Sequence, residues 1–173
     1  ALRGGGGNFG VVTNFEFGLH PMQRQIVGGD LLFPIARARE ILAFYGDFSS
    51  NAPDELYADC FMAAPMGGKP GVIGISVCYS GPDADAARVL APLRKLGTPI
   101  ADTIKAQAYV AIQRSSDRTD PRNEGAYMKE GFIRDFRAGM VDDILEGFQP
   151  HAERGTVIYF QHGGGAIRRV APD

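Results

Sequence analysis

The sequence predicts an α+β fold in which an antiparallel β-sheet is covered on one face by helices. Strand-like segments come in pairs joined by short turn-rich connections, and three segments with helical spacing separate these pairs. Antiparallel sheets commonly pack one face on a core and leave the other face in solvent. Helices on a single side of the sheet would therefore complete the core.

The strands are predicted from alternation of apolar and polar residues and from the turns that bound them. The connection over 66–71 is rich in glycine and proline, which favours an antiparallel hairpin between its two flanking strands. The glycine-rich start of the chain leads directly into the first predicted strand, which ends at His20 and Pro21. The predicted strands cover 11–19, 24–33, 55–65, 72–80, 99–106, 127–132 and 156–162.

Three amphipathic helices are predicted over 34–48, 82–96 and 140–148, where apolar residues recur every three or four positions. Pro34 fits a helix start, and Gly97 fits the position just after a helix end. A short helical turn is predicted over 109–113, and the polar stretch 115–125 reads as a loop.

Length and charge exclude several classes of protein. The chain has 173 residues, enough for one domain with a real core, and its net charge of −2 lacks the cationic excess that nucleic-acid binding requires. No apolar run approaches the roughly 20 residues of a membrane span. We expect a soluble protein that binds neither nucleic acid nor membrane, with the cytoplasm slightly favoured as its compartment.

The glycine-rich start of the chain is the first candidate binding segment. Residues 5–10 have the spacing of a dinucleotide fingerprint, but a predicted strand follows where that motif needs a helix, so a Rossmann site is rejected. Bare backbone could still approach a phosphate or a flat ring, and a flexible linker or hairpin turn is the equal alternative. Because a natural domain rarely begins inside such a run, we expect the sequence to belong to a longer protein.

Neither a metal site nor a catalytic triad is indicated by the sequence. The three histidines, His20, His151 and His162, have no partners at ligand spacing, and no nucleophile motif occurs. Cys60 and Cys78 lie in apolar stretches and are interpreted as buried thiols, with a disulfide as the minority alternative.

Two further segments carry candidate ligand contacts. Gln161 and His162 end a strand just before three glycines, a pattern typical of a pocket wall, although an ordinary strand end with a bulge is comparably plausible. Tyr127 and Lys129 share one face of a short predicted strand and could line a cleft, although a solvated lysine is the commoner case.

Several of these motifs resemble one family in the same order along the chain. The stretch ALRGGGGNFGVVT at 1–13, with FEF at 15–17 and LHP at 19–21, resembles the junction between the flavin domain and the substrate domain of berberine bridge enzyme-like oxidoreductases. Later landmarks of the same family are YSG at 79–81, LAPL at 90–93, YVAIQ at 109–113, MKEGF at 128–132, GGAI at 164–167 and APD at 171–173.

The resemblance implies a parent protein that carries FAD in the vanillyl-alcohol oxidase type of fold and oxidises a small organic substrate by hydride transfer to the flavin. Residues 1–20 would end the FAD-binding domain, and 21–173 would form a substrate-binding domain truncated before its C-terminal segment. The residues near FAD would be Gly5, Gly6, Gly7, Asn8, Gly10 and Val11, and the candidate substrate contacts are Tyr127, Lys129, Gln161 and His162.

The chain also departs from the family. It has no counterpart of the family's remaining flavin domain or of its catalytic tyrosine segment, so we expect it to be catalytically silent alone. Gln161 stands where some relatives have a glutamate base, and an amide would orient a substrate without accepting its proton. The alternative is a stand-alone α+β binding or dimerisation module without cofactor. In either case a sheet face that lacks its partner could also form a homodimer.

Overall fold

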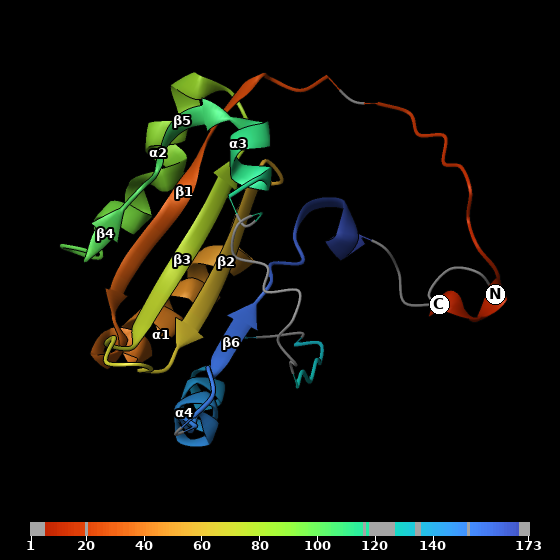
Figure 1. The fold of residues 1–173 in the computed structure, drawn as a ribbon. Helices are drawn as coiled ribbons and strands as arrows, with labels where there is room; N and C mark the ends of the chain where they lie inside the picture. The colour runs from red at the N-terminus through yellow and green to blue at the C-terminus, as the bar shows by residue number, and fades with distance from the viewer. Residues whose placement is uncertain are drawn as a thin grey trace.

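A computed structural model describes residues 6–19, 21–115, 117, 127–133, 136–151 and 153–169. Its centre is an antiparallel sheet with the strand order β4-β1-β3-β2-β6, and β5 pairs with a second part of β1 (Figure 1). The strands are β1 (Gln25–Pro34), β2 (Leu56–Ala63), β3 (Val72–Tyr79), β4 (Ala101–Asp102), β5 (Lys105–Ala108) and β6 (Val157–Phe160).

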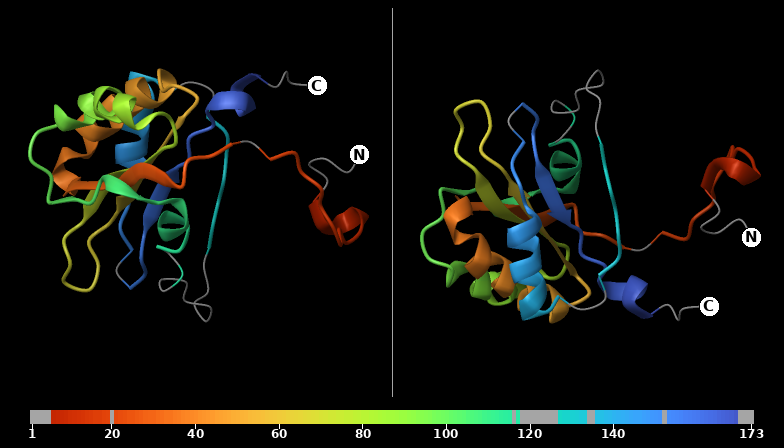
Figure 2. Two further views of the ribbon diagram at one scale, coloured as in Figure 1. Left: turned by 90° about the horizontal axis from the view of Figure 1, so that it is seen from above. Right: turned by 90° about the horizontal axis from the view of Figure 1, so that it is seen from below.

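The helices lie mainly on one side of this sheet. α1 (Ala38–Ser50), α2 (Asp83–Arg94) and α4 (Ala138–Gly147) form that layer, while the short α3 (Tyr109–Gln113) lies on the opposite side against one end of β1 (Figure 2). Three short 3-10 turns complete the described elements, at Gly6–Phe9, Ile35–Arg37 and Gly165–Arg169. The predicted α+β fold with one helix-covered face is thus confirmed, and α3 is an addition on the other face.

Alternation along the strands decides which side chains form the core. Every second residue of β2 and β3 points under the helices, and these residues are buried. The strand register aligns the buried apolar residues of neighbouring strands, since Leu31 pairs with Ile75 and Ile75 pairs with Cys60. α1 adds Ile41, Leu42 and Tyr45 from one helical stripe to the same cluster. Tyr45 donates a hydrogen bond from its hydroxyl to the Phe160 carbonyl, at 3.0 Å, which ties α1 to β6.

Most predicted elements occur close to their expected limits. The strands predicted over 24–33, 55–65, 72–80 and 156–162 correspond to β1, β2, β3 and β6, and the three amphipathic helices and the turn at 109–113 are also present. Gly97 has the positive φ of +80° typical of a glycine after a helix, but it lies two residues beyond the Lys95 C-cap of α2 and not directly after the helix. The strand predicted over 99–106 is divided into β4 and β5. Both cysteines are free thiols, Cys60 buried and Cys78 partly so.

Two predicted strands are not formed. Residues 10–19 are exposed and contain no strand, although Phe15 and Phe17 stack on one another at 5.4 Å. Residues 127–132 are likewise exposed and without regular structure. Alternation creates a strand only where a neighbouring strand takes up the backbone hydrogen bonds, and no described strand runs beside either segment.

None of the helices in the described part of the chain combines the length and the apolarity that a membrane span needs.

Candidate ligand-binding face of the sheet

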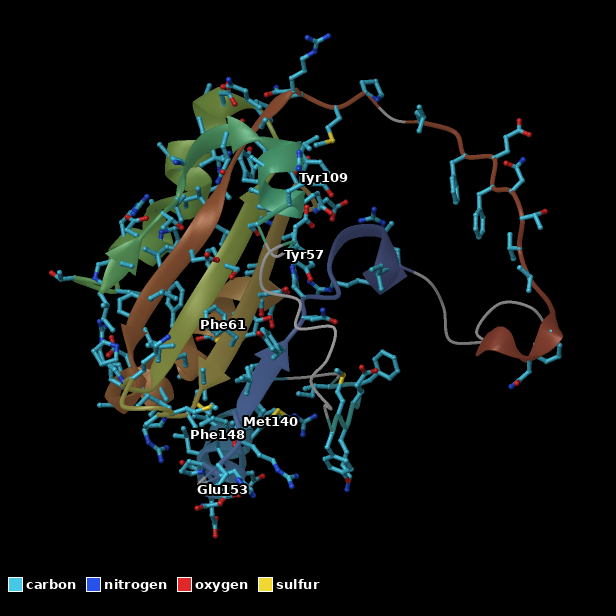
Figure 3. All side chains as sticks on the ribbon, in the orientation of Figure 1. Tyr57, Phe61, Tyr109, Met140, Phe148 and Glu153 are labelled. Carbon is cyan, nitrogen blue, oxygen red and sulfur yellow. The ribbon has the colours of Figure 1, made fainter. Side chains whose placement is uncertain are left out.

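The side of the sheet that faces away from α1, α2 and α4 is called the open face here. Figure 3 labels Tyr57 and Phe61, which project from β2 on this face, and Tyr109 on α3. Alternation and register give the side chains that share the open face: Asp30, Leu32, Tyr57, Asp59, Phe61, Ser76, Cys78, Val157 and Tyr159. Many of them are partly or largely exposed, in contrast to the buried residues of the opposite face.

A row of polar side chains crosses the middle of the open face. Asp30 on β1 pairs with Ser76 on β3, and Ser76 pairs with Asp59 on β2. The Ser76 hydroxyl donates to Asp30 Oδ1 at 2.6 Å. Because neighbouring strands lie about 4.8 Å apart, two carboxylates about 10 Å apart face the same side.

Asp59 is the best-connected member of this row. Its Oδ2 accepts a hydrogen bond from the Tyr57 hydroxyl at 2.9 Å, and its Oδ1 accepts one from the His162 backbone N–H at 2.9 Å. Partial burial raises the pKa of Asp59, and the two hydrogen bonds oppose this effect. Burial, followed by the hydrogen bond to Asp59, raises the pKa of Tyr57 to about 12, so this phenol is neutral at physiological pH.

The raised pKa of Asp59 gives a testable pH dependence. Because the folded protein holds this proton more tightly than the unfolded chain, the free energy of unfolding falls as pH rises from the ordinary carboxyl value of about 4 through the folded pKa. Asp59→Asn removes the titration. Urea unfolding between about pH 4 and about pH 7 should therefore show the wild type losing stability relative to the variant.

Asp83→Asn is the control for loss of one exposed carboxylate, since Asp83 lies in the first turn of α2 and outside the open face. A constant stability difference between wild type and Asp59→Asn across this pH range would contradict the prediction.

His162 lies at this end of the row, where its backbone N–H donates to Asp59 Oδ1. Its ring lies 6.2 Å from the Tyr57 ring, and both ring nitrogens are buried. Burial lowers the pKa of His162 and favours the neutral ring. A Cβ at Gly164 would lie 2.5 Å from this ring, so a residue without a side chain is needed there.

Aromatic side chains flank the polar row. Phe61 and Tyr159 form a ring contact at 6.0 Å, and Tyr159 is 70% exposed. The Phe61 ring occupies the space above Gly74, where a Cβ would approach it to 2.5 Å. The open face therefore combines hydrogen-bond acceptors with aromatic surface, an arrangement suited to a small organic molecule.

The structure places the predicted substrate contacts unequally. Gln161 is exposed and directly follows Phe160, the last residue of β6, which pairs with Cys60. Tyr127 and Lys129 lie in an exposed segment, where the Lys129 ammonium lies 5.9 Å from the Tyr127 ring. Within the described part of the chain, no hydrogen bond, ion pair or ring contact joins these two residues to Asp59 or His162.

The predicted cofactor contacts lie apart from the sheet (Figure 1). Gly6, Gly7 and Asn8 belong to the first 3-10 turn, and Gly10 and Val11 follow it; Gly5 lies outside the described residues. Nothing lies within 4 Å of a Cβ built at Gly7 or Gly10. The structure thus leaves this backbone accessible and does not bring it to Gln161 or His162.

Sequence reasoning missed Asp30, Tyr57, Asp59 and Ser76. A signal for them was present, since Tyr57 and Asp59 alternate with Leu56, Ala58 and Cys60 in a strand whose other face is apolar. A carboxylate inside such a strand is unusual enough to mark a site. Their alignment into one row across three strands depends on register, which no local pattern reveals.

Comparison with curated proteins yields relatives of one kind. The chain is 28% identical over its full length to an FAD-linked oxidoreductase of Dictyostelium discoideum, and 33% identical over 66% of its length to the FAD-linked oxidoreductase aurO of Gibberella zeae. The chain is related to FAD-linked oxidoreductases. A third such relative is the (R)-6-hydroxynicotine oxidase of Paenarthrobacter nicotinovorans, 30% identical over 63% of the chain.

The similarity covers only part of the length of each of these FAD-linked oxidoreductases. The chain spans 37%, 23% and 24% of the lengths of the three relatives, in the order given. No family model and no solved structure matches the chain. The family resemblance noted in the sequence is confirmed by these relatives, whereas the roles of individual residues are not tested by them.

Proposed function

We propose that the open face is the substrate-binding surface of an FAD-linked oxidoreductase that oxidises a small organic molecule by hydride transfer. The observation that carries this proposal is the row of Asp30, Ser76 and Asp59 between aromatic side chains on a sheet face free of the main helix layer. The His162 backbone N–H, which donates to Asp59 Oδ1 at 2.9 Å, supports it because it fixes the Asp59 carboxylate at the end of this row.

The glycine-rich segment suits a contact with FAD. Open space around Gly7 and Gly10 would let a phosphate or a flat ring reach the backbone N–H groups. In our proposal Gly5, Gly6, Gly7, Asn8, Gly10 and Val11 contact the cofactor, residues 1–20 belong to the FAD-binding part, and 21–173 form the substrate part. When bound, FAD would supply the hydride acceptor.

In this proposal, different residues of the open face contact different parts of the substrate. Asp30 and Asp59 present carboxylate oxygens that accept hydrogen bonds from hydroxyl or amine groups. Gln161 would orient the substrate, since a neutral amide donates and accepts hydrogen bonds without taking up a proton. Phe61 and Tyr159 would pack on the apolar part of the molecule. The substrate class that fits is therefore a small organic alcohol or amine.

The experiment is anaerobic titration of a full-length protein containing this chain with candidate alcohols and amines, followed by flavin absorbance. We expect a substrate to bleach the flavin, and Asp59→Asn to raise the half-saturating concentration about tenfold through loss of a charged hydrogen-bond partner. Asp83→Asn on α2 is the matched control and should leave the titration unchanged.

A full-length protein without flavin absorbance would contradict the proposal, as would an unchanged titration of Asp59→Asn.

If a full-length protein without flavin absorbance were also dimeric through the open face, the stand-alone binding or dimerisation module would replace the oxidoreductase proposal. Exposed Val157 and Tyr159 on β6 are the residues that favour this second candidate. Sedimentation of Tyr159→Lys would test it, since a charge in an apolar interface should dissociate the dimer.

A further inference from the structure

A hollow lies on the helix side of the molecule, away from the open face. It is a groove of about 820 Å³ lined by residues of α1 and α2. These two helices lie next to one another on the covered face (Figure 2). Its apolar lining comes from α1, α2 and the ends of β2 and β3: Phe44, Phe48, Leu56, Tyr79, Val89 and Pro92. A volume of this size suits a small organic molecule.

Three aromatic rings contribute to the lining of the groove. Phe44 and Phe48 stack one helical turn apart at 5.3 Å, with 18° between their planes, and both are half-buried. Tyr79 adds a third ring from the end of β3. Aromatic faces carry negative partial charge and attract cations, most strongly where water is excluded.

The charged residues that line this groove are mostly acidic. Asp47, Glu55 and Asp85 contribute carboxylates, while Arg88 contributes the single basic side chain and pairs with Asp85 at 2.9 Å. Asp47 and Glu55 have no ion-pair partner among the described residues. The lining therefore carries two uncompensated negative charges.

Tyr79 contributes a phenol hydroxyl to the lining of this groove. The residue is only 3% exposed, but its hydroxyl is not among the fully buried unpartnered atoms, so this oxygen is accessible to a molecule in the groove. Burial, then Asp85 and Glu55, raise the pKa of Tyr79, which places these carboxylates near the phenol. Gly81 accommodates the hydroxyl, because a Cβ there would lie 2.4 Å from it.

We propose that this groove binds a small amphipathic organic cation, with its ammonium group near Glu55, Asp47 and the Tyr79 hydroxyl and its apolar body on Phe44, Phe48 and Val89. An ammonium N–H would donate to the Tyr79 oxygen and satisfy it. The same acidic lining repels a carboxylate ligand, and a neutral ligand would leave the two charges without a partner. The site is independent of the open face and of the proposed oxidoreductase activity.

The test compares three probes with one scaffold: phenylbutylamine, phenylbutanol and phenylbutyrate. Calorimetry at neutral pH and low salt should show that the amine binds with a Kd below about 1 mM. The alcohol should bind at least about fivefold more weakly, and the carboxylate should not bind. Amide chemical shifts should change along α1, α2 and the ends of β2 and β3.

Variants assign the binding to named groups. The double variant Asp47→Asn with Glu55→Gln should weaken amine binding about tenfold, because it removes both uncompensated charges. Asp83→Asn is the matched control, since Asp83 lies in the first turn of α2 but does not line the groove. Tyr79→Phe should weaken the amine about threefold and leave its trimethylammonium analogue unchanged, because that analogue has no N–H to donate.

Equal affinity for amine and alcohol would overturn the proposal, as would the absence of binding by the amine. Unchanged binding in the double variant, or shift changes confined to the open face near Asp59, would also overturn it. We expect every variant to fold, because the substituted carboxylates are exposed and Tyr79→Phe keeps the aromatic ring. An unchanged circular dichroism spectrum would show that each variant is folded.

Discussion

Replacing Gly29 by alanine is expected to lower the free energy of unfolding by about 3 kcal/mol or more. Gly29 has φ +142°, a conformation that residues with a side chain rarely adopt. A Cβ there would also lie 2.4 Å from the Thr103 carbonyl oxygen, which is backbone and cannot rotate away. The clash would separate β1 from the connection between β4 and β5, where the Thr103 N–H donates to the Asp30 carbonyl at 2.9 Å.

Gly97→Ala is the matched control for the conformational part of this effect. Gly97 has φ +80°, but a Cβ there meets nothing within 4 Å. We expect it to cost only about 1 kcal/mol, which is the penalty of a left-handed residue alone. Chemical denaturation followed by circular dichroism gives both values. Equal losses in the two variants would show that the contact with Thr103 is unimportant.

Replacing Phe33 by alanine is expected to cost about 3 to 5 kcal/mol. Phe33 is fully buried on the helix side of β1, where it pairs with Ile73 across the sheet. The Arg37 guanidinium lies 4.7 Å from its ring centroid. Truncation would leave a cavity in the core and remove this cation–π contact, so unfolding by denaturant should occur at a much lower concentration.

Phe61→Ala is the control for the sidedness of the sheet. Phe61 lies on β2 and carries the same side chain, but it projects to the open face and is only half-buried. We expect a loss of about 1 to 2 kcal/mol, because less apolar surface is removed from contact. A larger loss for Phe61→Ala than for Phe33→Ala would contradict the assignment of the core to the helix side.

The elements that sequence patterns predicted well are those whose stability is local. The helix stripe of α1, the positive φ of Gly97 beyond the end of α2 and the turn between β2 and β3 all follow from spacing within about a dozen residues. The strands predicted over 11–19 and 127–132 failed for the opposite reason. Their alternation is real, but a strand also needs a neighbour, and the described strands leave both segments unpaired.

The candidate site shows the same division. Gln161 and His162 could be singled out because a polar strand end before three glycines is visible in the sequence. Asp59 could not be linked to His162, because 103 residues separate the two ends of their hydrogen bond. The groove between α1 and α2 was equally invisible, since its carboxylates come from α1, from the turn before β2 and from α2.

The sequence by itself determined the α+β class, the limits of most helices and strands, and the relationship to FAD-linked oxidoreductases. These depend on short-range periodicity and on residue order along the chain. The tertiary structure alone decided that Asp30, Ser76 and Asp59 form one row, that His162 lies against Tyr57, and that the predicted cofactor segment lies apart from the sheet. Strand register and helix packing bring distant residues together, and both are set by burial of the whole core rather than by any local segment.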